Sequence, residues 1–148
     1  MIDRLFPNDD RHGTNRKFLD GATAKATSIY NVLELCGISS FTISSMELTK
    51  LFMNFHRQYN LQVLYPKPKG SSPEETIRHM VSGIFEKICM KMNYSDAQIL
   101  LVAEQYNCTD FVTWNVKHFN ERTHLTVKSP ADFDDQPDEN DLRGHSHQ

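Results

Sequence analysis

Two oxygen-bearing side chains flank a short apolar strand in the second half of the chain. Ser95 and Gln98 have the spacing of a capping box, which predicts that Asp96 lies in the first turn of a helix. Residues 110–114 are typical of a short inner strand, and the chain turns at Asn115. In a parallel sheet, helix starts and the carboxyl ends of strands lie near one edge, where α/β proteins bind ligands. This layout is typical of a metal site.

The chemistry that such a site suits is the hydrolysis of phosphodiesters. Mg²⁺ and Mn²⁺ prefer oxygen ligands, and several converging carboxylates let the ion polarise a phosphoryl oxygen and activate a water. Glu34 is a further candidate, because a carboxylate between Leu33 and Leu35 loses hydration unless a cation or hydrogen bonds compensate. We therefore predict that Glu34, Asp96 and Asn115 converge on one ion.

Each candidate also has an ordinary structural interpretation. Asp96 would stabilise the helix dipole, Glu34 would be a helix-surface residue, and Asn115 would be a turn residue. Residue types and spacing alone do not decide between these interpretations and the metal site.

Two stretches of the sequence resemble a known family. Residues 95–119, SDAQILLVAEQYNCTDFVTWNVKHF, resemble the C-terminal half of a PIN domain, the metal-dependent ribonuclease fold of VapC-type toxins. The family pattern is an acidic residue, Ala and an apolar helix, then a strand ending in Thr-x-Asn or Thr-x-Asp, then Asp-Phe. Residues 27–38, TSIYNVLELCGI, resemble the family's short strand and helix, whose Glu would be Glu34. The resemblance covers about residues 2–130.

The resemblance implies a fold, an activity and partners. The fold would be α/β, a PIN-like three-layer sandwich with a mostly parallel central sheet. The activity would be that of an endoribonuclease which hydrolyses RNA phosphodiester bonds with Mg²⁺ or Mn²⁺. Glu34 and Asp96 would hold the metal, and Asn115 would position metal or water. The family also implies a homodimer and inhibition by a small antitoxin protein.

The chain departs from the family pattern at both ends of the site. PIN domains begin with a strand ending in an Asp that is a principal metal ligand, whereas MIDRLFPNDD resembles the family's segment after that strand. We therefore expect the first strand and its Asp to be missing, with Asp3 at a later, non-ligand position. Asn115 replaces one common carboxylate, which lowers the charge of the site. His118 stands at the other acidic position, where it could ligate Mn²⁺, contact phosphate or be a surface imidazole. The alternative function is a PIN-like domain without catalysis that binds RNA or a protein partner.

The charge is unevenly distributed along the 148 residues, of which 39% are hydrophobic. Residues 131–148 hold six acidic residues and one Arg, and we expect this acidic tail to be disordered. Residues 1–130, the predicted PIN-like domain, hold fifteen Lys and Arg against thirteen Asp and Glu. This mildly basic body suits local phosphate contacts. A phosphate-binding α/β domain of another family is disfavoured, because the sequence has no Gly-rich phosphate loop.

Short strands alternate with helices in the predicted order of elements. Helices are expected at about residues 10–22, 28–37, 44–59, 72–92 and from 95, and strands near 25–27, 61–65, 110–114 and 125–127. Cys36, Cys89 and Cys108 lack C-x-x-C spacing and are expected to be buried free thiols. The sequence has no long apolar run and no secretion signal, and we predict a cytoplasmic protein.

Overall fold

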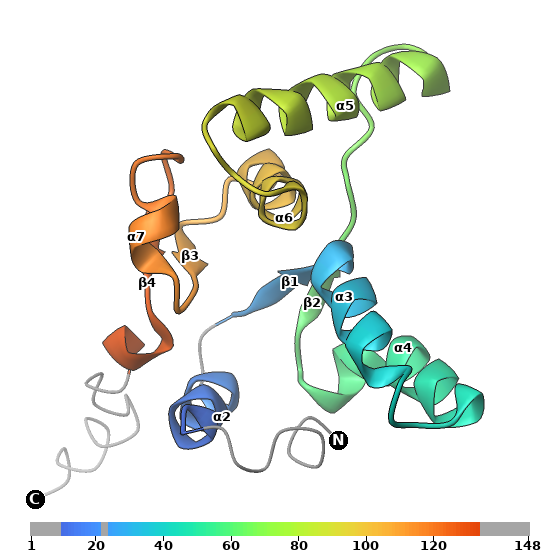
Figure 1. Ribbon diagram of the computed structural model, residues 1–148, viewed down its shortest axis with the longest axis vertical. Coiled ribbons are helices and arrows are strands. Elements are labelled where there is room, and N and C mark those ends of the chain that lie inside the picture. Colours follow the sequence, from blue (N-terminus) through green and yellow to red (C-terminus); the bar gives the residue numbers. More distant parts are fainter. Residues whose placement is uncertain (1–9, 22–23, 134–148) are drawn as a thin grey trace, which may run out of the picture.

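The computed structural model describes residues 10–21 and 24–133, which form a mixture of helices and short strands (Figure 1). The helices are α2 (His12–Asp20), α3 (Ile29–Ser39), α4 (Ser45–Gln58), α5 (Pro73–Cys89), α6 (Tyr94–Gln105) and α7 (Val116–Phe119). The strands are β1 (Ala26–Ser28), β2 (Gln62–Leu64), β3 (Asp110–Val112) and β4 (Thr126–Lys128), and the 3₁₀ turn η1 spans Pro130–Phe133. The acidic tail after Phe133 and the residues before Asp10 lie outside the described residues.

The four strands form two separate parallel pairs. β1 pairs with β2, in register from Ala26 opposite Gln62, and β3 pairs with β4, in register from Asp110 opposite Thr126. The α/β class is confirmed, and within each pair the strands are parallel. A single central sheet is not formed within residues 24–133, because no described strand joins β1 to β3.

Two hydrophobic clusters hold these elements, and α6 lies between them. One cluster packs α5, α6, β3 and α7 around Leu100 and Phe111, and the other packs α3 against α4 around Val32 and Leu51. α6 contacts α5, α3 and β1, so that it connects the two halves of the molecule. Figure 1 shows α3 and α4 on one side of α6, with β3, β4 and α7 on the other.

Local sequence signals set most helix starts. Ser28, Ser44 and Ser72 each cap a helix by accepting a hydrogen bond from a backbone N–H three residues later. The predicted helix end at Gly37 is wrong, because α3 continues to Ser39, whose side chain is buried. β2 and β3 are shorter than predicted, with three residues each, whereas β1 and β4 have the predicted length and lie one residue later in the sequence.

Helix α5 is covered on one face only. The apolar spacing in residues 72–92 predicts that Ile77, Val81 and Phe85 pack inward with Ile84, but of these four only Ile84 is buried, and the other three are more than half exposed. The reason is that α5 packs against α6 and lies along the outer edge of the molecule (Figure 1). The apolar pattern thus predicted the helix correctly. It overestimated how much of the helix surface is buried.

The three cysteines are free thiols, as predicted, but they differ in burial. Cys36 is buried in the α3–α4 cluster, where burial raises the pKa of its thiol. Cys108 is partly buried, and Cys89 is exposed at the end of α5, so burial was predicted wrongly for Cys89.

None of the helices in the described ranges is long and apolar enough to cross a membrane.

Candidate functional site

Asp96 lies in the first turn of α6, as the sequence predicts, but a different residue caps the helix. Asn93, and not Ser95, is the N-cap, and its Oδ1 accepts a hydrogen bond from the Asp96 backbone N–H at 2.8 Å. The Asn93 side-chain amide also donates to Asp96 Oδ2 at 2.8 Å. These two bonds fix the carboxylate at the positive end of the helix dipole.

His118 of α7 reaches the same carboxylate. Its Nε2 lies 3.2 Å from Asp96 Oδ2, and the two side chains are only 23% and 25% exposed. The two groups are in close contact, although the buried Nε2 atom makes no hydrogen bond with acceptable angles among the described residues. The contact brings together the start of α6 and the turn after β3, the two places that the sequence singles out.

Arg122 holds the other side of the imidazole. Its Nη1 lies 3.2 Å from His118 Nδ1 and also donates to the His118 backbone carbonyl, and its Nε donates to the Met90 carbonyl at 2.7 Å. A guanidinium can only donate, so the Arg122 contact is a hydrogen bond in the tautomer whose Nδ1 accepts, and in that tautomer the ring proton lies on Nε2. The cluster therefore has a fixed order of guanidinium, imidazole and carboxylate.

Asn115 lies one turn before His118. It is the N-cap of α7, its exposed side chain makes no capping bond, and its backbone carbonyl accepts a bond from the His118 N–H at 3.0 Å. Its backbone N–H donates to Thr113 Oγ1 at 3.1 Å. The side-chain amide of Asn115 is therefore not committed to capping the helix.

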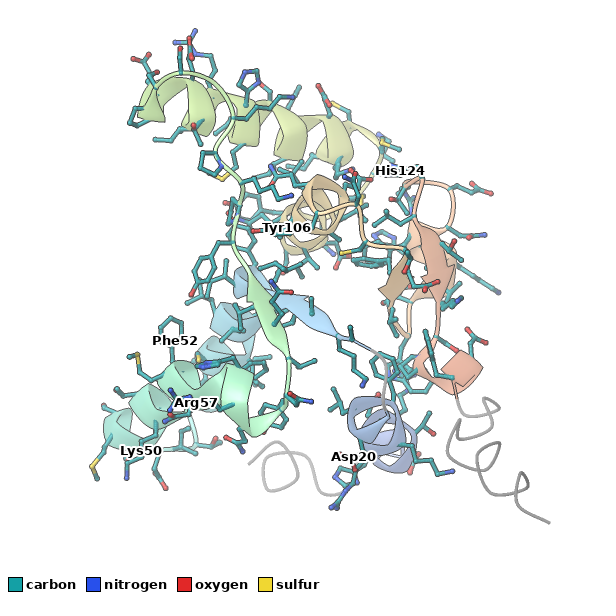
Figure 2. The ribbon with its side chains drawn as sticks, turned by 180° about the vertical axis from the view of Figure 1, so that it is seen from behind. Asp20, Lys50, Phe52, Arg57, Tyr106 and His124 are labelled. Atoms are coloured by element: carbon teal, nitrogen blue, oxygen red, sulfur yellow. The ribbon has the colours of Figure 1, made fainter. Side chains whose placement is uncertain are left out.

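Glu34 does not join these residues. It is exposed on α3, which lies on the opposite side of α6 from α7 in both views (Figures 1 and 2). Among the described residues, no group of three or more His, Cys, Asp or Glu side chains is placed to hold a metal ion. The structure thus brings Asp96 together with the helix that carries Asn115, and leaves Glu34 apart.

Asp96 nevertheless has the environment of a carboxylate that can hold an ion. Its Oδ2 carries the contacts from Asn93 and His118, while Oδ1 has no hydrogen-bond or ion-pair partner within the described ranges. Metal-binding carboxylates are commonly oriented by such outer contacts. Mg²⁺ is often held by one or two carboxylates, with water and substrate phosphates as the other ligands. Asp96 Oδ1 is therefore the atom of this cluster that could take a cation, and the nearest helix, α7, begins at Asn115.

His118 and Arg122 are the residues whose roles the sequence left open or missed. The signal for His118 was its place at an acidic position of the family pattern. Arg122 had no signal in the sequence, because its role depends on the turn after α7, where its backbone N–H bonds to the Phe119 carbonyl.

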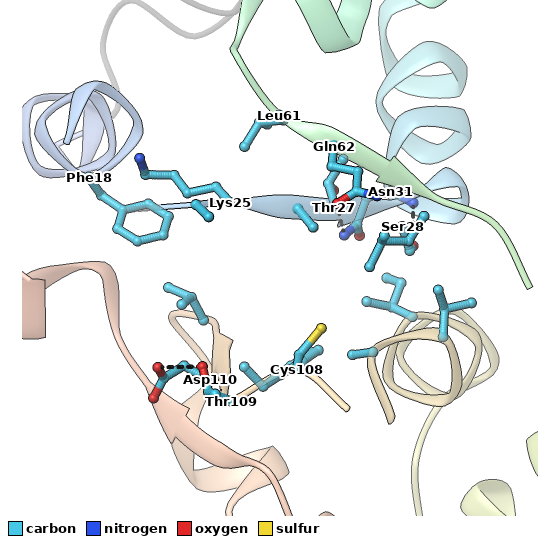
Figure 3. Close-up of a pocket in the computed structure, with 18 of the residues that line it drawn as sticks. Phe18, Lys25, Thr27, Ser28, Asn31, Leu61, Gln62, Cys108, Thr109 and Asp110 are labelled. Carbon is cyan, nitrogen blue, oxygen red and sulfur yellow. Dashed lines mark hydrogen bonds between the residues drawn. The ribbon is translucent and has the colours of Figure 1, made fainter. Parts of the chain in front are cut away.

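The described structure also has a hollow away from these residues. A cleft of about 440 Å³ separates β1 from β3 and is lined by residues of α2, β1, β2, α6, β3 and η1 (Figure 3). None of Glu34, Asp96, Asn115 and His118 lines it. We call it the inter-sheet cleft.

Comparisons with known proteins leave the family open. No protein-family model, no curated protein and no solved structure matches the chain at a significant level. The resemblance to PIN domains therefore rests on the two motifs in the sequence.

Proposed function

We propose that the chain is a metal-dependent endoribonuclease of the PIN type, with Asp96 as the residue that holds the metal. The supporting observation is the contact of 3.2 Å between Asp96 Oδ2 and His118 Nε2, which joins the start of α6 to α7. This contact joins the Asp96 carboxylate, which Asn93 also holds, to the helix that begins at Asn115.

Each residue of the cluster has its own role in this proposal. A bound Mg²⁺ or Mn²⁺ would polarise a phosphoryl oxygen of RNA and lower the pKa of an attacking water. Asp96 would hold the ion, and Asn115 would position the ion or the water. His118 orients the Asp96 carboxylate, and Arg122 keeps the imidazole proton on Nε2. Lys117, exposed on α7, contacts the RNA backbone.

Glu34 has a weaker place in the proposal. Because α3 lies across α6 from α7, the site has one well-placed carboxylate, and a bound ion would need other ligands, such as water and RNA phosphates. Glu34 remains a proposed ligand on the family resemblance alone. The homodimer and the antitoxin partner rest on the same resemblance.

The test is cleavage of a fluorescently labelled single-stranded RNA with Mg²⁺ or Mn²⁺. We expect cleavage by the unmodified chain, its loss on adding a chelator, and its loss in Asp96→Asn. Glu74→Gln is the matched control, because Glu74 is an exposed carboxylate on α5 whose partner is Arg78, away from the site. Undiminished cleavage by Asp96→Asn, or none with any divalent ion, would refute the proposal.

One observation favours a second function, binding of RNA or a protein partner without catalysis. In the part of the chain that the structure describes, no three ligating side chains gather at one point. A binding domain would retain RNA or its partner in the presence of chelator and would leave the RNA intact. Its affinity would not depend on Asp96, which separates it from the nuclease in the same set of variants.

A further inference from the structure

The inter-sheet cleft lies between two sheets that are each very small. β1 and β3 face each other across it (Figure 3), and each has a described neighbour strand on its other side only. Two-stranded sheets are marginally stable by themselves, and further strands or packing against helices stabilise them. A strand between β1 and β3 would turn two pairs into one sheet of five strands.

The backbone hydrogen bonds show which groups border the cleft. Gln62 N–H donates to the Lys25 carbonyl at 3.0 Å, so Lys25 and Thr27 bond toward β2. Because successive residues of a strand alternate in direction, the N–H and C=O of Ala26 point to the other edge, which lines the cleft.

The same alternation holds for β3. Thr126 N–H donates to the Thr109 carbonyl at 3.2 Å, and Thr113 N–H donates to the Lys128 carbonyl at 2.9 Å. Thr109, Phe111 and Thr113 therefore bond toward β4, and the backbone groups of Asp110 and Val112 point into the cleft. Both borders of the cleft thus present N–H and C=O groups that a strand could pair with.

The side chains around the cleft are largely apolar and electrically balanced. α6 contributes Ile99 and Val102 to the lining, and Leu64 and Val112 come from the two sheets. One cation and one anion line the cleft, namely Lys25 and Asp110, and Asp110 is paired with Lys128 at 2.7 Å. A neutral, apolar occupant suits this lining, because the lining offers little to compensate the desolvation of a charge buried in the cleft.

We propose that the inter-sheet cleft binds an extended apolar strand supplied by a different protein, which pairs with β1 on one side and with β3 on the other. A peptide backbone offers N–H and C=O groups on both of its edges at the spacing of neighbouring strands, and an acyl chain or an RNA does not. The mode is strand addition, in which main-chain bonds give affinity and alternate side chains fill the space above α6. The proposal is independent of the nuclease site.

Two cysteines of this chain make the test internally controlled. The Cys108 side chain lines the cleft and its sulfur projects into it (Figure 3), whereas Cys89 is exposed at the end of α5. The rate at which iodoacetamide alkylates each thiol in the full chain can be followed by mass spectrometry. The probe is a synthetic heptapeptide with five alternating Val and Ile residues between terminal lysines. Its control carries N-methyl groups on alternate amides, which remove hydrogen-bond donors and keep the side chains.

We expect the probe to protect Cys108 and not Cys89. At a probe concentration ten times the Kd, alkylation of Cys108 should slow about 11-fold. The N-methylated peptide should leave both rates unchanged.

Three results would overturn the proposal. The first is a Cys108 rate that the probe does not change. The second is a Cys108 that is already alkylated far more slowly than Cys89 in the monomer without probe. This would mean that the chain's own residues outside the described ranges fill the cleft. The third is protection that rises with protein concentration as a dimer forms, which would make a second copy the occupant.

Discussion

A buried ion pair joins α5 to α6, and its removal gives a sharp test of the packing around the site. Lys87 Nζ lies 2.6 Å from Glu104 Oε2, and the two side chains are only 9% and 17% exposed. Glu104 Oε1 also accepts a hydrogen bond from the Thr123 hydroxyl at 2.8 Å. The pair therefore links α5, α6 and the segment that leads into β4.

Lys87→Met should destabilise the protein by about 3 kcal/mol, which is at the lower end of the cost of breaking a buried ion pair. The cost is at the lower end because the Thr123 hydroxyl still donates a hydrogen bond to the Glu104 carboxylate. Met retains much of the apolar stem that Lys87 buries, so the loss reports on the charge rather than on a cavity. The double variant Lys87→Met with Glu104→Gln removes both charges, and it should be less destabilised than Lys87→Met alone.

Urea unfolding provides the free energies, and an exposed pair on the same helix is the control. Arg78 Nη2 lies 2.9 Å from Glu74 Oε1, with side chains 74% and 81% exposed, so Arg78→Met should cost no more than about 0.5 kcal/mol. If Lys87→Met costs no more than Arg78→Met, or if the costs of the two single variants add in the double variant, the reasoning about burial is refuted.

Two further predictions concern the loop before α5. Gly70→Ala should destabilise the protein by about 2 kcal/mol, because φ at this position is +103° and the new Cβ would lie 2.7 Å from Glu75 Cβ. Gly37→Ala in α3, where the new Cβ meets open space, should stabilise the protein by about 0.5–1 kcal/mol. Equal effects of the two substitutions in urea unfolding would contradict this. The backbone N–H and hydroxyl of Ser71 hold the pKa of Glu75 below its usual 4.5, so this carboxylate stabilises the fold above that pH and loses its contribution as pH falls through the lowered pKa. The difference in Tm between the unmodified chain and Glu75→Gln should therefore shrink below about pH 4.5, and a difference that is constant with pH would exclude this linkage.

Helix starts could be predicted from the sequence because their determinants are local. The Ser44 capping box and the Ser72-Pro73 start depend on side chains within three residues of the cap, and both formed. The start of α6 was misplaced by two residues, because two polar candidates compete there. Asn93 both accepts from the Asp96 N–H and donates to its carboxylate, and the Ser95 hydroxyl lies inside the helix that results.

The assembly of the site could not be predicted, because it depends on how distant elements pack. Residue types identified Asp96 and the turn at Asn115, and the contact through His118 places these segments together. The expected convergence of Glu34 required β1 and β3 to belong to one sheet. Since the described strands form two sheets separated by a cleft, α3 and α7 stay on opposite sides of α6.

The most direct test of the account is the stabilisation of the protein by Mn²⁺, measured as the change in Tm. At a Mn²⁺ concentration ten times the Kd, the free energy of unfolding of the unmodified chain and of the Glu74→Gln control should rise by about 1.4 kcal/mol. Removal of the His118 side chain should weaken Mn²⁺ binding by about 10-fold, as loss of a contact to a metal-binding carboxylate does. Asp96→Asn should show no Mn²⁺ shift, because it replaces the carboxylate that holds the ion. A Mn²⁺ shift in Asp96→Asn equal to that of the unmodified chain would contradict the assignment of Asp96 as the metal-holding residue.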